Sequence, residues 1–306
     1  MRFGSVALVG RTNVGKSTFL NAVLGEELAV VSPLPQTTRE TLLGVVHRPD
    51  AQIAFIDTPG LHRPRTELGR RMNASAVEAL RTADLVLLLT DVERSSKDAA
   101  ALFERDKEVL ELLPAEAHSI LVLNKVDLIR DKNKLLPLLD AYAKTRDFLA
   151  IVPASVRSRN DAERVLELLA EHLPGGEPGY EADFLTDRAT PYFVREYVRE
   201  QVLKSTLREV PHAVAVSVDA IEQREKVLAI KATIHVEKDG QRRIVVGKGG
   251  ATIKSIGTGA RKKLEDLTGQ HIFLELFVRI SARWKDVPRQ LAELGYDAPN
   301  SKGRGP

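Results

Sequence analysis

The chain has 306 residues, 45 of them Lys or Arg and 42 Asp or Glu, and 43% are hydrophobic. This length predicts two domains, and the composition indicates packed cores rather than intrinsic disorder. The absence of cysteine excludes disulfides, thiolate metal sites and thiol nucleophiles. No apolar run approaches the roughly 18 residues of a membrane helix, and the first residues lack the apolar core of a signal peptide, so we expect a cytoplasmic protein.

Residues 1–173 alternate short apolar runs with helical patterns. The predicted strands cover residues 6–9, 52–56, 85–89, 120–123 and 148–152, and the predicted helices cover 66–81, 97–113 and 160–173. This alternation is typical of an α/β fold, in which helices cover both faces of a mostly parallel sheet.

The pattern changes after residue 173. Glycine and proline are dense at 174–179, which predicts a linker over residues 174–190. A small α+β domain is then expected over 191–295, from a helix at 191–207, strands at 214–218 and 227–236, a helix at 251–267, a strand at 271–280 and a candidate helix at 285–293. Residues 296–306 are expected to form a disordered tail.

The segment 10–17 fits the P-loop pattern of Gly, four residues, Gly, Lys and Ser, between a predicted strand and a helix. Its glycines let backbone N–H groups surround phosphate oxygens at a helix N-terminus. We expect Lys16 to bridge the β- and γ-phosphates and the Ser17 hydroxyl to bind Mg²⁺. The nucleotide-binding residues expected here are Asn13, Val14, Gly15, Lys16, Ser17 and Thr18.

Two later loops follow predicted strands in the same way. Asp57 ends the second strand, where its carboxylate can reach the Mg²⁺ shell, and the Gly60 N–H can bond the γ-phosphate. The motif Asn124-Lys125-Val126-Asp127 follows the fourth predicted strand, and Asn124, Lys125 and Asp127 are expected to bind the nucleotide. The Asp127 carboxylate can accept hydrogen bonds from N1–H and the N2 amino group of guanine, which adenine lacks, so GTP is favoured over ATP. The region of Ser155 would supply a backbone contact to the base.

A second glycine-rich loop lies in the C-terminal half. Between residues 238 and 263 there are eight basic residues and one acidic residue, a local charge of +7 that suits a polyanion. A solvated helix face and an ordinary turn are the alternatives. The expected RNA contacts are Gly247, Lys248, Gly249, Gly250 and Lys254, with Ile244, Val245, Val246 and Ile253 beneath the bases and Lys262 and Lys263 as peripheral phosphate contacts.

The order of the three nucleotide motifs resembles the translation-factor class of GTPases. Gln36-Thr37-Thr38-Arg39 and the stretch 57–62 resemble the Era family of ribosome-assembly GTPases, and the second domain resembles a type II KH domain. The resemblance implies GTP hydrolysis with Mg²⁺, and Thr38, or failing that Thr37, as a metal ligand when GTP is bound. The implied metal ligands are thus Ser17, Thr38 and Asp57, and the implied catalytic residues are Lys16, Thr38 and Gly60.

The resemblance also implies partners. These are the 3′ end of 16S rRNA and the 30S subunit, in whose maturation a monomeric protein would act, with peripheral association at the inner face of the cell membrane. Leu61 departs from Ras-like GTPases, which carry a water-orienting Gln there, and this implies slow or stimulated hydrolysis. Asn13 is open to two interpretations, as a residue that helps hold K⁺ in some relatives or as a loop cap. Two alternative functions are an RNA-binding scaffold with little turnover and a membrane-surface GTPase whose basic cluster meets anionic lipid.

Overall fold

The computed structural model describes residues 1–34, 36–92, 99–206 and 210–296, without the side chains of 99–103. These residues form two compact units. One unit holds residues 1–29, 36–63 and 72–187, and the second is built on residues 188–296. Of the expected tail, only Tyr296 lies within the described residues.

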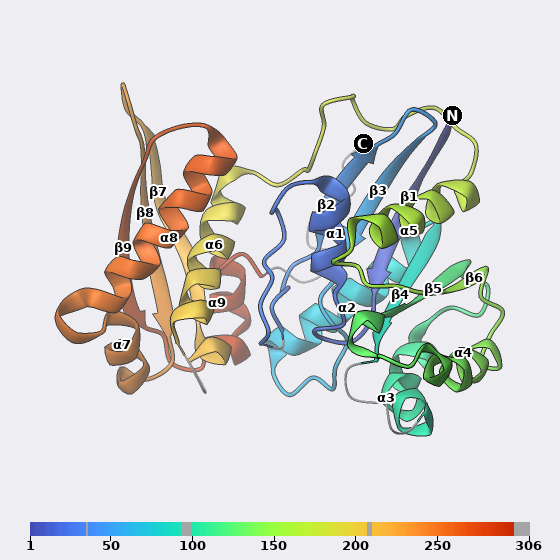
Figure 1. The fold of residues 1–306 in the computed structure, drawn as a ribbon. Helices are drawn as coiled ribbons and strands as arrows, with labels where there is room; N and C mark the ends of the chain where they lie inside the picture. Colours follow the sequence, from blue (N-terminus) through green and yellow to red (C-terminus); the bar gives the residue numbers. More distant parts are fainter. Residues whose placement is uncertain (35, 93–98, 207–209, 297–306) are drawn as a thin grey trace. The chain divides into compact units, whose positions relative to one another are not determined.

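The first part of the chain forms an α/β sheet with helices on both faces (Figure 1). Its elements are β1 (Arg2–Val9), α1 (Lys16–Leu24), β2 (Leu42–His47), β3 (Ala51–Asp57), α2 (Glu67–Thr82), β4 (Leu85–Asp91), α3 (Ala99–Leu112), β5 (Ser119–Asn124), 3-10 turns at Val126–Leu128 and Lys132–Leu135, α4 (Leu136–Ala143), β6 (Ala150–Pro153) and α5 (Arg159–His172). The strand order is β2-β3-β1-β4-β5-β6. The described strands run parallel except β2, which is antiparallel to β3, so the predicted fold class is confirmed.

The apolar runs that the sequence analysis predicted as strands form the central strands of the sheet. β4 and β5 are buried along their whole length, because α2, α3 and α4 cover one face of the sheet while α1 and α5 lie on the other. The carboxyl ends of β1, β3, β4 and β5 meet at one edge, and each continues into a loop singled out in the sequence.

Three features of this unit were not expected. β2 and α4 are additional elements, and β2 pairs with β3 through a tight turn in which the Arg48 N–H donates to the Ala51 carbonyl at 2.8 Å. The expected linker does not run free. The Phe3 N–H donates to the Pro174 carbonyl at 3.1 Å, and the Tyr180 N–H donates to Gln52 Oε1 at 2.9 Å, so this Gly- and Pro-rich segment is fastened to the sheet.

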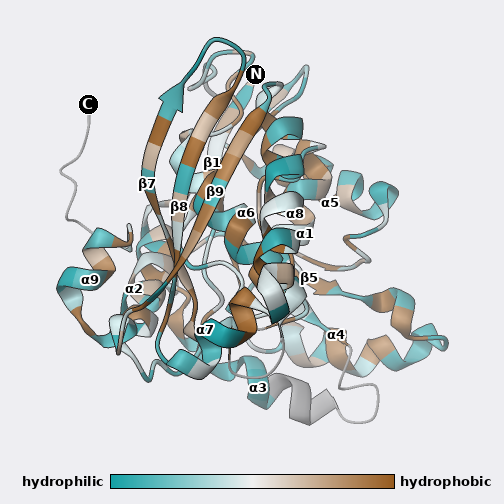
Figure 2. Cartoon of the chain, turned by 90° about the vertical axis from the view of Figure 1, so that its left-hand side faces the viewer, coloured by the Kyte–Doolittle hydropathy of each residue, from teal (hydrophilic) through white to brown (hydrophobic). Residues whose placement is uncertain are grey.

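The second unit is a helix-covered sheet with the strand order β7-β8-β9. Its elements are α6 (Thr190–Ser205), a 3-10 turn at Pro211–Ala213, β7 (Ala215–Gln223), β8 (Leu228–Val236), α7 (Asp239–Val246), a 3-10 turn at Lys248–Gly250, α8 (Ala251–Thr268), β9 (Ile272–Ile280), a 3-10 turn at Trp284–Asp286 and α9 (Pro288–Glu293). β7 is antiparallel to β8, and β9 is parallel to it. Figure 2 shows polar and apolar residues mixed along these strands. The sequence did not predict α7, which precedes the glycine-rich loop.

Trp284 anchors the end of this unit. Its side chain is fully buried, its indole N–H donates to the Ala213 carbonyl at 3.0 Å, and its ring stacks on Tyr296 with centroids 5.9 Å apart. This is the core role that its size favours.

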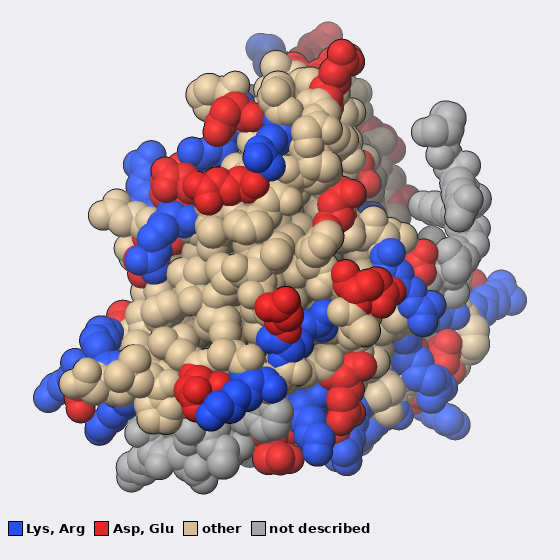
Figure 3. Space-filling model, turned by 90° about the vertical axis from the view of Figure 1, so that its right-hand side faces the viewer, with Lys and Arg blue, Asp and Glu red and all other residues tan. Residues whose placement is uncertain are grey.

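Within the described ranges, we find no helix that combines the length and the apolar character needed to cross a membrane. On the face drawn in Figure 3, acidic and basic side chains are interspersed rather than separated by sign. The basic cluster singled out in the sequence, residues 238–263, belongs to the second unit.

Candidate nucleotide and RNA sites

The P-loop glycines are required by their surroundings. Gly10 has φ +149° and Gly15 has φ +110°, conformations that L side chains rarely adopt. A Cβ on Gly10 would lie 2.2 Å from the Leu89 carbonyl oxygen, and one on Gly15 would lie 2.3 Å from Asn124 Nδ2. The P-loop is therefore wedged between β4 and the loop that follows β5, which brings two of the predicted motifs into contact.

The remaining P-loop residues take distinct places. Asn13 is exposed with φ +65°, Val14 is buried and Thr18 is half-buried in α1. The Lys16 side chain is buried, and its ammonium donates to the carbonyls of Gly10 at 3.1 Å and Arg11 at 2.9 Å. Burial lowers the pKa of Lys16 to about 8, while the charge of Asp57 opposes this shift. The ammonium thus stays largely protonated at neutral pH, next to the place where phosphates would bind.

The predicted metal ligands come together. The Ser17 hydroxyl donates to Asp57 Oδ2 at 2.7 Å and lies 2.9 Å from the Thr38 hydroxyl, which is itself 3.4 Å from Asp57 Oδ2. Asp57 is completely buried, and burial raises its pKa to about 6 against the influence of Lys16 and the two hydroxyls. Its Oδ1 atom is buried and has no hydrogen-bond partner among the residues that the structure describes. Two hydroxyls and a carboxylate with spare acceptor capacity on Oδ1 fit Mg²⁺, which prefers oxygen ligands.

Gly60 brings the second loop against the first. A Cβ there would lie 2.7 Å from the Thr12 backbone nitrogen, and the Leu61 N–H donates to the Gly10 carbonyl at 3.2 Å. The Leu61 side chain is buried in the core cluster beneath α2 and α3. It packs in the core, and an aliphatic chain has no group that could orient water.

The loop after β5 is organised by Asn124. Its Nδ2 donates to the Val14 carbonyl at 2.7 Å, and its Oδ1 accepts from the N–H groups of Lys125 at 2.7 Å and Val156 at 3.0 Å. Asp127, three residues after Asn124, is exposed, as a base-recognising carboxylate must be. The Ser155 backbone is engaged within the protein, because its N–H donates to Asp161 at 2.7 Å and its carbonyl accepts from Ser158 at 2.7 Å.

The loop Gly247–Gly250 joins α7 to α8. Gly247 has φ +75°, and a Cβ there would lie 2.2 Å from the Thr252 hydroxyl, whereas Gly249 and Gly250, at φ +57° and +80°, have nothing within 4 Å. Lys248 and Lys254 are exposed beside the loop. The loop therefore offers open backbone next to two cations.

The apolar residues around this loop divide into two groups. Ile244 is 51% exposed on α7, and Val246 and Ile253 are half-buried, but Val245 is fully buried and belongs to the core. Among the basic residues, Lys262 is exposed, whereas the Lys263 ammonium lies 2.9 Å from the buried Glu200 carboxylate and 5.2 Å from the centre of the Tyr197 ring. Lys263 therefore serves the packing of α8 on α6.

Comparison with known proteins agrees with this geometry. Residues 5–125 match the family described as 50S ribosome-binding GTPase, and residues 209–285 match the KH domain. GTPase Era of Trichlorobacter lovleyi is 41% identical over 96% of this chain and 97% of its own length, and that of Geobacter metallireducens is 43% identical over 96% and 98%. The chain belongs to the GTPase Era family.

Solved Era structures are similar over nearly the whole length. Era in complex with MgGDPNP and nucleotides 1506–1542 of 16S ribosomal RNA matches with a TM-score of 0.91 and 35% identity, covering 97% of this chain and 99% of that one. A variant of Aquifex aeolicus Era bound to GDP and aluminium fluoride matches with a TM-score of 0.91 and 34% identity, covering 97% and 100%. As an Era-family GTPase, this chain uses GTP and GDP with Mg²⁺.

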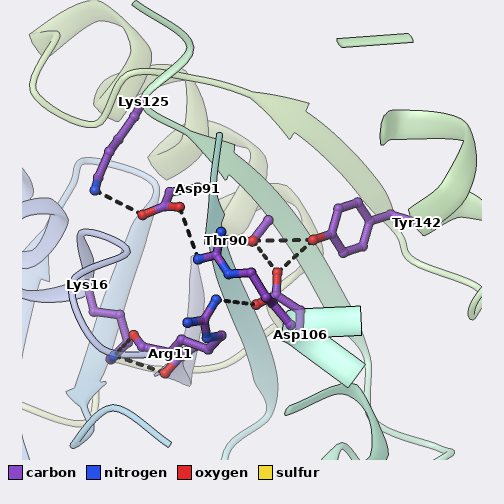
Figure 4. A network of polar contacts seen from close by, with 9 residues as sticks. Arg11, Lys16, Thr90, Asp91, Asp106, Lys125 and Tyr142 are labelled. Atoms are coloured by element: carbon purple, nitrogen blue, oxygen red, sulfur yellow. Dashed lines mark hydrogen bonds and ion pairs between the residues drawn. The ribbon is translucent and has the colours of Figure 1, made fainter. Parts of the chain in front are cut away.

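Sequence reasoning missed a set of charged residues behind the Era-family nucleotide loops (Figure 4). Asp91 ends β4 and pairs with Lys125, with 2.9 Å between Oδ2 and Nζ. Asp106 of α3 is buried, accepts from the Thr90 and Tyr142 hydroxyls and lies 3.9 Å from Arg11 Nη1. Burial raises the pKa of Asp106. The position of Asp91 at the carboxyl end of a buried strand was the signal that could have found it.

Proposed function

We propose that this Era-family GTPase binds the 3′ end of 16S rRNA through its KH domain and acts in maturation of the 30S subunit. The observation that carries the proposal is the loop Gly247–Gly250, whose open backbone adjoins exposed Lys248 and Lys254. The similar Era structure that contains a segment of 16S rRNA supports this choice of target. The proposed domains are a G domain over 1–173, a linker over 174–190 and a KH domain over 191–295, and the start of the second compact unit at residue 188 supports the last of these.

In the G domain, the bond broken is the β–γ phosphoanhydride of GTP. Ser17, Asp57 and, with GTP, Thr38 would hold Mg²⁺, which would supply charge stabilisation at the phosphate oxygens. Lys16 would transfer its hydrogen bonds from the carbonyls of its own loop to the phosphates. The Gly60 N–H would sense the γ-phosphate. Because Leu61 is packed in the core, catalysis rests on positioning and electrostatics rather than on a side chain that orients water.

Guanine selection is assigned to Asp127. An Asp127→Asn variant should shift preference from guanine towards xanthine nucleotides, because an amide can donate a hydrogen bond where xanthine presents an acceptor. Competition binding with GDP, XDP and ADP measures this. Equal binding of ADP and GDP by the unmodified protein would overturn the assignment.

The RNA proposal is tested at Gly249, where a side chain meets no neighbouring atom. Asp and Asn both tolerate the left-handed conformation and have nearly equal volume, so Gly249→Asn is a matched control for Gly249→Asp. We expect Gly249→Asp to abolish binding to the single-stranded 3′ end of 16S rRNA, Gly249→Asn to weaken it less, and both to keep GTP hydrolysis. Lys262→Ala should weaken binding modestly and reduce its salt dependence. Unchanged RNA affinity of Gly249→Asp would show that the loop is only a turn.

Leu61 favours one rival, an RNA-binding scaffold with little turnover. Steady-state phosphate release, in K⁺ and in Na⁺, separates this rival from a switch and decides between K⁺ binding and loop capping as the role of Asn13. We also propose that the protein is a cytoplasmic monomer that associates peripherally with the inner face of the cell membrane. Flotation with anionic liposomes in competition with RNA decides whether the basic cluster serves lipid instead, and sedimentation reports the oligomeric state.

A further inference from the structure

The carboxylate of Asp91 contacts the loop that is expected to bind guanine, residues 124–127. Asp91 is the last residue of β4, next to β5 in the sheet, and its register partner is Asn124. Its side chain is 8% exposed, and its Oδ2 lies 2.9 Å from the ammonium of Lys125 (Figure 4). A carboxylate that is buried to this degree needs a cation nearby. The Lys125 ammonium therefore stabilises Asp91, and Asp91 in turn restrains the Lys125 side chain.

Lys125 needs such a restraint because its backbone is strained. Its φ of +63° lies in the left-handed region, which costs a residue with a side chain free energy unless its surroundings impose that conformation. Asn124 Oδ1 holds its N–H at 2.7 Å, and Asp91 holds its ammonium, so Lys125 is fixed at both ends. Asp127 follows Lys125 by two residues, so the backbone conformation of Lys125 sets the direction in which the chain leads to Asp127.

The same carboxylate has a second, more distant cation. Arg105 Nη2 of α3 lies 3.8 Å from Asp91 Oδ1, and the next residue, Asp106, faces Arg11 of the P-loop. Asp91 could therefore serve the α3 packing through Arg105 or the guanine loop through Lys125. The shorter distance favours Lys125.

We propose that Asp91 is a positioning residue for guanine recognition, acting through Lys125 to keep Asp127 directed at the base. This rests on the proposed role of Asp127. Loss of the Asp91 charge should relax the loop, speed nucleotide release and reduce the preference for bases that carry the N2 amino group. A residue with a merely structural role would weaken all nucleotides equally.

The test uses Asp91→Asn in the full chain, which preserves shape and an oxygen acceptor. Release of fluorescent GDP and of fluorescent IDP, whose hypoxanthine base lacks the N2 amino group, is measured by stopped flow. We expect GDP release to become about tenfold faster, with a smaller effect on IDP, and kcat at saturating GTP to stay within about threefold. Equal acceleration of both nucleotides would overturn the proposal.

A double-mutant cycle identifies the partner. Lys125→Gln alone should reproduce the loss of GDP-over-IDP preference, and combining it with Asp91→Asn should add little, because the two residues act as a unit. Arg105→Gln is the matched control and should alter release by less than about twofold. Additive effects of the Asp91 and Lys125 changes, or a full loss in Arg105→Gln, would assign Asp91 to α3 instead. Asp84→Asn, at the residue that precedes β4, controls for loss of a carboxylate beside this strand. If the unmodified protein itself does not distinguish GDP from IDP, the Asp127 assignment fails first.

Discussion

Lys16 and Asp57 are buried charges in the nucleotide site whose pKa values move toward each other. Burial lowers the pKa of Lys16 to about 8 and raises that of Asp57 to about 6. Between these values both groups are charged, and each opposes the shift of the other. Binding of phosphate requires the charged Lys16, and binding of Mg²⁺ requires the charged Asp57. The site therefore has the charges that it needs for both ligands around neutral pH.

The first prediction follows from Asp57 in the protein free of nucleotide and Mg²⁺. Because its folded pKa lies above the ordinary value of 3.8, the folded protein binds the proton more tightly than the unfolded chain. The stabilisation that Asp57 contributes to the folded state is present below pH 4 and is lost as pH rises through about 6. Relative to an Asp57→Asn variant, the unfolding free energy of the unmodified protein should therefore fall by about 3 kcal/mol over this interval.

Urea denaturation of both proteins across this pH range measures the difference. Mg²⁺-dependent GTP binding should show the opposite trend and strengthen as Asp57 ionises. A pH-independent difference between the two proteins would show that Asp57 titrates normally.

The second prediction separates the neighbouring threonines. Thr38 lies on Ser17 and Asp57, so Thr38→Ala should weaken GTP binding about tenfold and GDP binding much less, because a switch residue is used only when the γ-phosphate is present. Thr37→Ala is the matched control and should have the smaller effect on GTP. Titration with GDP and a non-hydrolysable GTP analogue measures this, and equal losses for both nucleotides in Thr38→Ala would make it a structural residue.

At the scale of elements, the glycine-rich loop between α7 and α8 contains a glycine with a structural role, Gly247, and one with a functional role, Gly249. Gly247→Ala should lower the thermal midpoint of the second unit, because its Cβ would clash with Thr252 in addition to the strain of a positive φ. Gly249→Ala meets only the backbone strain, roughly 1–2 kcal/mol. Thermal unfolding of the two variants compares them. A Gly249→Ala variant as unstable as Gly247→Ala would contradict the open geometry of the loop.

The elements that the sequence predicted well are those whose pattern has one physical origin. Strands such as β4 and β5 are apolar throughout because both faces are covered, and the three nucleotide motifs end such strands. α7 was missed because Gln241 caps it through backbone N–H groups, with polar and basic residues filling its exposed face. The Asp91–Lys125 pair was missed because it joins residues 34 positions apart that only the register of β4 and β5 brings together.

At the scale of the molecule, each unit has a core of its own, and Trp284, the only tryptophan, lies in the second. A ligand stabilises the part of a protein that binds it. We therefore expect GDP with Mg²⁺ to raise the midpoint of unfolding followed by circular dichroism, while the midpoint followed by tryptophan fluorescence stays unchanged. A fluorescence midpoint that rises with GDP would show that the two units unfold as one.

In the site without ligand, the functional groups already have partners. Lys16 donates to carbonyls of its own loop, and the hydroxyls of Ser17 and Thr38 lie against Asp57. The phosphates of a nucleotide therefore replace existing hydrogen bonds of Lys16, and each new contact there contributes only the difference between the two. The reverse also holds, because Lys16 can form its hydrogen bonds to the loop carbonyls again when the phosphates leave.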